Sequence, residues 1–261
     1  MTVESNSTEA RAGSAMRSLS RAIQVFEQLQ RYEHPQRLNQ IAKDCGMSSP
    51  TTLRILRVLQ DSGLVSQTDK NYRIGPAVLP AARVFLEADP LPRSARPILQ
   101  QLAQNTGLTA SLYTRLGFER VLVERVVGAA SLGYELPQGR RLPLTVGAAG
   151  KILLAALDEE QLAEVISAAV ELRYEPVGFT LEELRRRLPA AGEDYAYSED
   201  ERATGVVSVA VAVPSRNDGV TESIALTAPV HSSSRDDLVA RVPELRHAAR
   251  RLADLLASTV Y

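Results

Sequence analysis

The sequence predicts an α+β protein with two domains: an N-terminal winged helix-turn-helix and a larger domain in which helices flank a mixed or antiparallel sheet. Residues 18–75 hold three helix-like segments followed by two short strand-like segments. After residue 93, helix-like and strand-like segments alternate, and the strand pairs are spaced like hairpins. The length of 261 residues suits this division, since domains usually hold roughly 100–200 residues.

The composition excludes several classes of protein. With 44% hydrophobic and 23% charged residues, the chain can bury a core, so global disorder is excluded. No run of about eighteen apolar residues could cross a membrane, and residues 1–16 lack the apolar segment of a secretory signal. We therefore expect a cytoplasmic protein with no membrane partner. One cysteine and three histidines without ligand spacing predict no disulfide, no metal site and no cofactor.

The first domain is expected to follow a disordered polar tail over residues 1–17. From residue 18, apolar side chains recur with helical spacing, and this helix ends before residue 34. The apolar residues are Leu19, Ala22, Ile23, Phe26 and Leu29. A short helix over 39–45, with Asn39 as its N-cap, then ends at Gly46, which suits a left-handed residue after a helix.

A third helix completes the helical part of this domain. It begins at Ser49 as N-cap, with Pro50 in the first helical position, and it ends at Gly63. Residues 64–65 and 72–74 predict two short strands around a polar loop. Three helices and a hairpin over 18–75 predict a winged helix-turn-helix.

Residues 76–93 predict a linker helix. The second domain is expected to span residues 94–261. Its predicted elements are a helix at 94–105, strands near 109–115 and 119–127, a strand or loop at 131–144, helices at 148–157, 159–170 and 180–191, strands at 206–213 and 223–228, and a final helix at 235–257.

The segment 38–65 has the parts that a DNA-reading helix-turn-helix needs: a short helix, a glycine-containing turn and a second helix with a polar start. Residues 1–75 carry 10 basic and 7 acidic groups, and residues 76–261 carry 20 basic and 24 acidic groups. The N-terminal part therefore has a positive net charge and the remainder a negative one. Hydroxyl and basic groups on the third helix and the wing could contact phosphates or base edges. The candidate DNA-contacting residues are Ser48, Ser49, Thr51, Thr52, Arg54, Arg57, Lys70 and Arg73. The alternative is a helical hairpin inside a larger core, with surface arginines.

Residues spread over 18–257 match one known pattern. In the first domain they are Arg21-Ala22, Ile41-Ala42, Gly46, Thr51, Arg54, Leu56, Leu59, Gly63 and 72–75, and in the second they are the segments 142–157, 193–219 and 223–229. In their order and spacing the chain resembles the IclR family of bacterial transcription regulators. The resemblance implies that the winged helix-turn-helix binds a palindromic operator DNA and that a GAF-like domain over 94–261 binds an effector. It also implies a homodimer or dimer of dimers, which 94–261 would help to assemble and in which the linker 76–93 would couple the two domains and contribute to a dimer contact. Ser198, Ser208 and Ala225 replace an aspartate and cysteines that the family often has there.

The segment GAAGK at 147–151 is not a phosphate loop, because Thr145 and Ile152 stand where a P-loop needs glycine and Ser or Thr. We interpret it as a helix start whose free N–H groups would bind a carboxylate without a buried lysine or arginine. The alternative is close backbone packing with no ligand. Hydroxyls and small side chains on the later strands would complete the site. The candidate effector-binding residues are Thr145, Gly147, Ala148, Ala149, Gly150, Ser198, Val206, Ser208, Ala225 and Thr227.

By strand parity, Val206 and Ser208 share one face, as do Ala225 and Thr227. These side chains would make a roomy wall that is partly apolar and partly hydroxylic. We therefore expect a small carboxylate effector, and a flat aromatic acid in preference to a very small keto acid.

No catalytic residues are predicted, because the chain has no G-x-S-x-G motif and its histidines lie near no nucleophile in sequence. The acidic run 199–201 favours a solvated or capping role over acid-base chemistry. Two competing hypotheses remain: a small-molecule enzyme domain fused to a helix-turn-helix interaction module, and a winged domain that binds protein in place of DNA.

Overall fold

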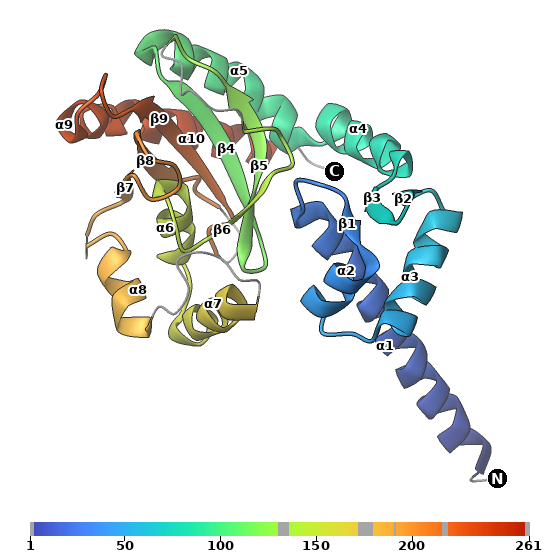
Figure 1. The fold of residues 1–261 in the computed structure, drawn as a ribbon. Coiled ribbons are helices and arrows are strands. Elements are labelled where there is room, and N and C mark those ends of the chain that lie inside the picture. Colours follow the sequence, from blue (N-terminus) through green and yellow to red (C-terminus); the bar gives the residue numbers. More distant parts are fainter. Residues whose placement is uncertain (1–2, 130–135, 172–179, 191, 216–218, 259–261) are drawn as a thin grey trace. The chain divides into compact units, whose positions relative to one another are not determined.

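The computed structural model describes residues 3–129, 136–171, 180–190, 192–215 and 219–258 (Figure 1). They form two compact units that divide between Phe85 and Leu86. The division falls inside the predicted linker. The α+β class, with an N-terminal helix-turn-helix and a C-terminal sheet domain, is confirmed.

The first unit has the three predicted helices and the wing. Its elements are α1 (Val3–Arg31), β1 (Gln36–Arg37), α2 (Leu38–Asp44), α3 (Ser49–Asp61), β2 (Val65–Thr68) and β3 (Asn71–Ile74). The strands pair antiparallel in the order β1-β3-β2, so the short strand β1, which the sequence did not predict, completes the wing sheet. Gly46 has the expected positive φ of 62° after α2.

Helix starts differ from their predicted positions. α1 begins at Val3, so residues 3–17, which we predicted as part of a disordered tail, are helical. α2 follows Arg37, and Asn39 is not its cap. α3 is capped by Ser48, whose Oγ accepts the Thr51 N–H at 3.4 Å, so Ser49 is already helical. Ser48 thus makes the capping bond that we predicted for Ser49. Both residues are serines, so the sequence does not show which of them lies at the cap.

The core of the first unit joins α1, α2, α3 and the wing. Its buried residues are Val25, Leu29, Ile41, Cys45, Leu56, Leu59, Val65 and Tyr72. The predicted apolar face of the first helix is only partly inward, because Leu29 is buried while Leu19 and Ile23 are exposed.

The predicted linker helix consists of three parts. A short 3-10 turn, η1 (Pro76–Val78), leads into α4 (Leu79–Ala88), and α5 (Pro90–Thr106) then starts four residues before the predicted domain boundary. Asp89 separates the two helices because its carboxylate accepts the Leu91 N–H at 2.9 Å and so caps α5. Every residue of α4 is exposed within this chain.

The second unit is built on a six-stranded sheet in the order β6-β5-β4-β9-β8-β7, antiparallel throughout. Its further elements are β4 (Thr109–Leu116), β5 (Glu119–Val126), β6 (Arg141–Pro143), α6 (Ala148–Leu154), α7 (Glu159–Glu171), α8 (Leu181–Arg187), β7 (Tyr195–Glu199), β8 (Val206–Ala212), β9 (Glu222–Pro229), α9 (Arg235–Val239) and α10 (Val242–Ser258). The sequence did not predict β7, and the predicted final helix is divided into α9 and α10. Part of the predicted strand or loop at 131–144 lies outside the described residues.

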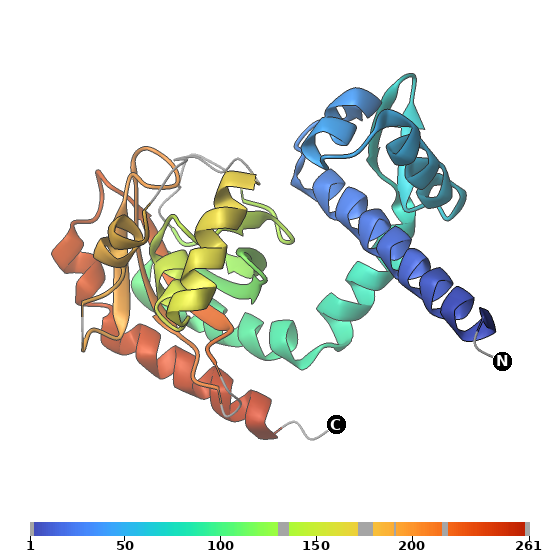
Figure 2. The same cartoon turned by 90° about the horizontal axis from the view of Figure 1, so that it is seen from below.

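Helices cover both faces of this sheet (Figures 1 and 2). α5 and α10 pack on one face, where a large aliphatic core includes Leu99, Leu112, Leu226 and Leu245. α6 packs on the other face against β7, β8 and β9, above small residues such as Ala196, Ala210 and Ala225. The small residues let the helix approach the sheet closely.

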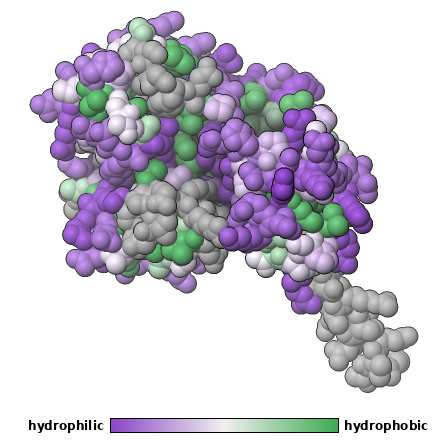
Figure 3. Space-filling view, in the orientation of Figure 1, coloured by the Kyte–Doolittle hydropathy of each residue, from purple (hydrophilic) through white to green (hydrophobic). Residues whose placement is uncertain are grey.

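Hydrophilic side chains cover most of the face that Figure 3 shows. Among the described residues, no helix is long and apolar enough to cross a membrane. Within the same residues, no three His, Cys, Asp or Glu side chains are grouped so that they could hold a metal ion.

The environment of Cys45 predicts an unreactive thiol. Burial raises the pKa of this thiol to about 11, and the negative charge of Asp44 acts in the same direction. Only the thiolate attacks disulfide reagents, so at pH 8 the native protein is expected to react with Ellman's reagent at least about tenfold more slowly than the unfolded chain. Stopped-flow absorbance with and without guanidinium chloride measures both rates. Equal rates would show that Cys45 is accessible in the folded protein.

Candidate functional sites

The basic side chains of the first unit lie on its surface. Arg54 and Arg57 are exposed along α3, and Lys70 and Arg73 are exposed on the wing. Their exposure leaves the guanidinium and ammonium groups available to a polyanion. Ser48 is also exposed.

The hydroxyl groups at the start of α3 mostly serve the turn. Ser48 Oγ and Thr51 Oγ1 lie 2.9 Å apart, and Ser49 Oγ donates to Asn39 Oδ1 at 3.3 Å. Thr52 is fully buried, at 0% exposure, and its Oγ1 donates to the Ser48 carbonyl oxygen at 3.1 Å. Its place among the DNA-contacting candidates is therefore wrong, because its side chain faces the interior of the domain.

The start of α6 presses closely against the sheet, and its glycines make this possible. A Cβ on Gly150 would lie 2.2 Å from the Leu144 carbonyl oxygen and 2.6 Å from Arg120 Nη1. Gly147 precedes the helix with φ of 79°, which favours glycine. The glycines of GAAGK are thus explained by backbone packing around a buried arginine, which was the alternative interpretation of this motif.

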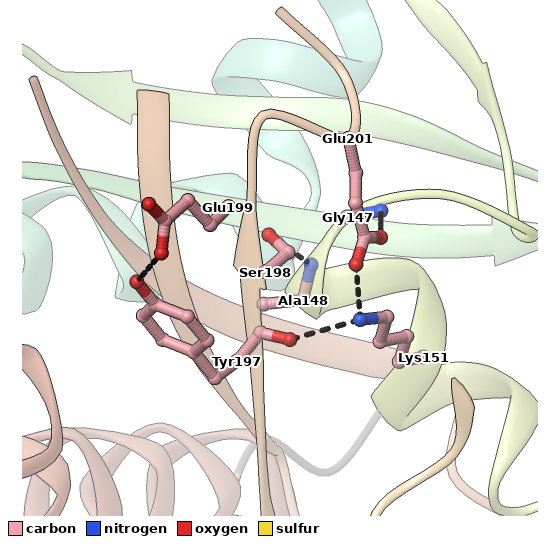
Figure 4. A network of polar contacts seen from close by, with 7 residues as sticks. All are labelled: Gly147, Ala148, Lys151, Tyr197, Ser198, Glu199 and Glu201. Atoms are coloured by element: carbon pink, nitrogen blue, oxygen red, sulfur yellow. Dashed lines mark hydrogen bonds and ion pairs between the residues drawn. The ribbon is translucent and has the colours of Figure 1, made fainter. Parts of the chain in front are cut away.

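The predicted free N–H groups at this helix start are already bonded within the chain (Figure 4). The Gly147 N–H donates to Glu201 Oε2 at 2.9 Å, and the Ala148 N–H donates to Ser198 Oγ at 3.0 Å. Lys151 forms an ion pair with Glu201, and its Nζ also donates to the Tyr197 carbonyl oxygen at 3.0 Å. The expectation that these N–H groups are free is wrong. Glu201 instead has the capping role that we considered for the acidic run.

Three of the predicted hydroxyl residues occupy neighbouring positions in the sheet. Ser198 on β7 pairs in register with Ser208 on β8, which pairs with Thr227 on β9. Ser208 Oγ lies 3.2 Å from Thr227 Oγ1 and donates to the Leu226 carbonyl oxygen at 3.0 Å. The row of hydroxyls therefore crosses three strands on the face that α6 covers.

A small pocket lies between this row and α6. Its lining residues are Tyr113, Arg120, Gly147, Ala149, Ser198, Arg202, Ala203, Val206, Ser208, Ala225 and Thr227. Seven of the ten predicted effector-binding residues are among them. Thr145, Ala148 and Gly150 are buried nearby but do not line the pocket.

Two arginines line the pocket, and the sequence analysis missed both. Arg120 is 2% exposed; its guanidinium lies 5.4 Å from the centre of the Tyr113 ring and donates to the Pro143 carbonyl oxygen. Burial lowers the pKa of Arg202. The nearby Tyr113 raises this pKa, and the like charge of Arg125 lowers it. The expectation of a site without a buried lysine or arginine is therefore wrong.

A sequence signal for Arg120 does exist. On β5, Arg120 lies two residues before the buried residue Leu122. Side chains two positions apart in a strand point to the same face, so Arg120 is expected on the buried face as well. Arg202 lies in a loop and has no comparable signal. The lining side chains together offer guanidinium and hydroxyl groups, and they include no histidine, cysteine or carboxylate. This chemistry suits the binding of an anion and lacks an acid-base pair.

A larger hollow of about 330 Å³ lies between α5 and α10. Its polar lining includes Gln101, His247 and Arg251, all of which are exposed. Volume alone would favour this hollow, but among the pockets of the described residues it is the one beside α6 that combines a buried arginine, Arg120, with a row of hydroxyls.

Comparisons with known proteins agree over both units. The sequence model of the IclR helix-turn-helix domain family matches residues 18–69 of this chain. The sequence model of the bacterial transcriptional regulator IclR C-terminal domain family matches residues 85–254. The chain is 30% identical over 240 residues to a probable transcriptional regulator, SauR, of Cupriavidus necator, covering 88% of this chain and 92% of that protein. It is 26% identical to the HTH-type transcriptional repressor AllR of Klebsiella pneumoniae, and the match covers 95% of this chain and 93% of AllR.

Solved structures share the fold. An IclR family transcriptional regulator from Brucella abortus aligns with a TM-score of 0.78 at 22% identity, covering 94% of this chain and 93% of that one. An IclR homologue from Microbacterium hydrocarbonoxydans, solved in complex with 4-hydroxybenzoate, aligns with a TM-score of 0.67 at 21% identity. The alignment covers 93% of this chain and 100% of the homologue.

The packing of α6 makes the variant Gly150→Ala a direct test of this geometry. The added Cβ would meet the Leu144 backbone and the Arg120 guanidinium, so a loss of about 3 kcal/mol of folding stability is expected in urea denaturation. The control is Gly117→Ala, where the positive φ of 61° is unfavourable for alanine, unlike the helical backbone at Gly150, but no atom lies within 4 Å, with an expected loss of about 1 kcal/mol. Equal losses in the two variants would contradict the close approach of α6.

Proposed function

The chain belongs to the IclR family of bacterial transcription regulators, and from this premise we propose that it binds a small carboxylate in the pocket beside α6 and that this binding changes its affinity for operator DNA. It has the family's helix-turn-helix and C-terminal effector domains, and its relatives are named regulators and repressors. The protein is therefore a regulator and not an enzyme, and the fused-enzyme hypothesis is wrong.

The observation that carries the proposal is the pair of arginines beside the hydroxyl row. A guanidinium group binds a carboxylate through two parallel hydrogen bonds, and such charge-assisted bonds are strong when water is excluded. Arg120 and Arg202 bring this chemistry into a largely buried pocket. Ser208 and Thr227 can donate to or accept from a second oxygen on the same ligand.

The ligand that we favour is an aromatic carboxylate with a further hydroxyl group. The relative that was solved with 4-hydroxybenzoate supports this choice. Val206 and Ala225 supply apolar contacts beside the charged groups, as a ring with one anionic end requires.

Operator recognition is assigned to α3 and the wing. Arg54 and Arg57 would contact phosphates or guanine, while Lys70 and Arg73 on the wing would neutralise phosphates. Because one such domain buries a small interface with DNA, two copies on a palindromic site are expected. We place this action in the bacterial cytoplasm.

A homodimer, or a dimer of such dimers, is supported by apolar side chains exposed within the single chain. They lie on α1 and α4, and they include Leu19, Ile23, Leu79, Val84 and Phe85. Apolar surface of this kind, exposed along helices, is characteristic of protein interfaces. A second copy of the chain is the partner that would cover them.

Replacing Arg54 with alanine is expected to weaken operator binding. The loss of one phosphate or base contact should cost about 1 kcal/mol or more, which fluorescence anisotropy with a labelled operator fragment can measure. Arg250→Ala, which removes an exposed arginine from α10, is the control and should leave the affinity unchanged. If the two variants bind the operator equally well, Arg54 does not contact DNA.

Replacing Arg202 with glutamine is expected to weaken the binding of 4-hydroxybenzoate by at least about tenfold in calorimetry, since one charge-assisted contact is lost. The neutral analogue 4-hydroxybenzamide should lose much less affinity, because it has no carboxylate to pair with Arg202. Equal losses for both compounds would contradict the assignment of Arg202 to the carboxylate.

A further inference from the structure

The pocket beside α6 is too small in this structure for any organic acid. It encloses about 20 Å³, which is close to the room that one water molecule needs. A carboxylic acid can therefore enter only if one wall of the pocket moves.

The strand and helix walls are poorly suited to move. β8 and β9 are hydrogen-bonded to strands on both sides, and every residue of α6 is buried. Gly147, just before α6, is buried as well, so among the described lining residues the wall best suited to move is the loop 200–205, which contributes Arg202 and Ala203 and whose residues are half-buried or exposed. Segments with few buried contacts open at the lowest cost in free energy.

The two ends of this loop are anchored to the sheet. The Asp200 N–H donates to the Val206 carbonyl oxygen at 3.0 Å, and the Gly205 N–H donates to Asp200 Oδ1 at 2.6 Å. The Val230 N–H also donates to the Gly205 carbonyl oxygen at 2.9 Å. Residues 201–204 can therefore swing between two fixed ends.

Glu201 ties the middle of the loop to α6. One carboxylate oxygen accepts the Gly147 N–H, and the other pairs with Lys151 (Figure 4). The Glu201 side chain is 23% exposed, so water can replace its partners when it leaves. Lys151 would keep its bond to the Tyr197 carbonyl oxygen. Both facts lower the cost of breaking this contact.

We propose that the loop 200–205 is the gate of the pocket and that Glu201 is its latch: a ligand enters when Glu201 leaves Lys151 and Gly147, and the loop then rests further out, with Arg202 on the ligand. This inference rests on the proposed function for the identity of the ligand. The latch itself is a contact within the chain and can be tested without any ligand.

Limited trypsin digestion tests the latch alone. Trypsin can cleave after Arg202 only when the loop leaves the domain. Glu201→Gln keeps a bond to the Gly147 N–H but loses the ion pair with Lys151, so cleavage at this bond should be about tenfold faster than in the wild type. Each rate, followed by mass spectrometry, is divided by that of the same bond in the unfolded variant, which corrects for the change in sequence.

The matched control is Glu199→Gln. Glu199 lies two residues away, but its carboxylate accepts from the Tyr197 hydroxyl at 2.8 Å and makes no bond to α6 among those drawn in Figure 4. This variant should be cleaved after Arg202 at the wild-type rate. Equal cleavage rates in Glu201→Gln and Glu199→Gln would overturn the latch.

Binding kinetics with salicylate, a fluorescent aromatic carboxylate, test the gate. Because the latch closes only the empty pocket, Glu201→Gln should raise the association rate constant about tenfold, leave the dissociation rate constant unchanged and so lower the dissociation constant by the same factor. An unchanged association rate constant in Glu201→Gln would overturn the gate, whether or not the dissociation constant changes. If salicylate binds neither wild type nor variant while cleavage is still accelerated, the latch stands and the aromatic-carboxylate assignment of the proposed function fails.

Discussion

The buried guanidinium of Arg120 is the constraint on which the effector domain depends. A cation in the interior must be met by polar groups, since an unpaired buried charge costs several kcal/mol or more. Here the Tyr113 ring and the Pro143 carbonyl oxygen lie against it. α6 must then start beside the same guanidinium, which leaves no room for a side chain at position 150. The loop before α6, the close helix–sheet contact and the position of the pocket all follow from this one side chain.

A positively charged pocket of this kind needs acidic groups near it when no ligand is bound. Glu201 meets this need at the edge of the pocket, where it pairs with Lys151 and caps α6. The next residue along the chain, Arg202, lines the pocket itself. Two adjacent residues of one loop thus hold the site closed and supply a group that would bind an anion. Under the proposed function, one short segment of the domain would therefore serve both ligand recognition and access.

Local patterns were sufficient to predict much of the fold. Helical spacing and turn residues predicted the three helices and the wing of the first domain, because these features depend on neighbours within one or two turns. Caps were less certain, since Ser48 and Ser49 have the same chemistry and only the backbone decides which one bonds the Thr51 N–H. Strand parity grouped Val206 with Ser208, and Ala225 with Thr227, and all four line one pocket. The contact between Glu201 and Gly147 joins positions 54 residues apart, so no local pattern reveals it.

The central claim is that a carboxylate in the effector domain changes the affinity of the other domain for DNA. The most direct measurement is the dissociation constant of the full-length protein for an operator fragment, in fluorescence anisotropy, with and without saturating 4-hydroxybenzoate or salicylate. Coupling between two sites of one protein is typically worth about 1–3 kcal/mol, so a shift of at least about fivefold is predicted. A dissociation constant that stays the same, under conditions where calorimetry shows the pocket to be filled, would contradict the account.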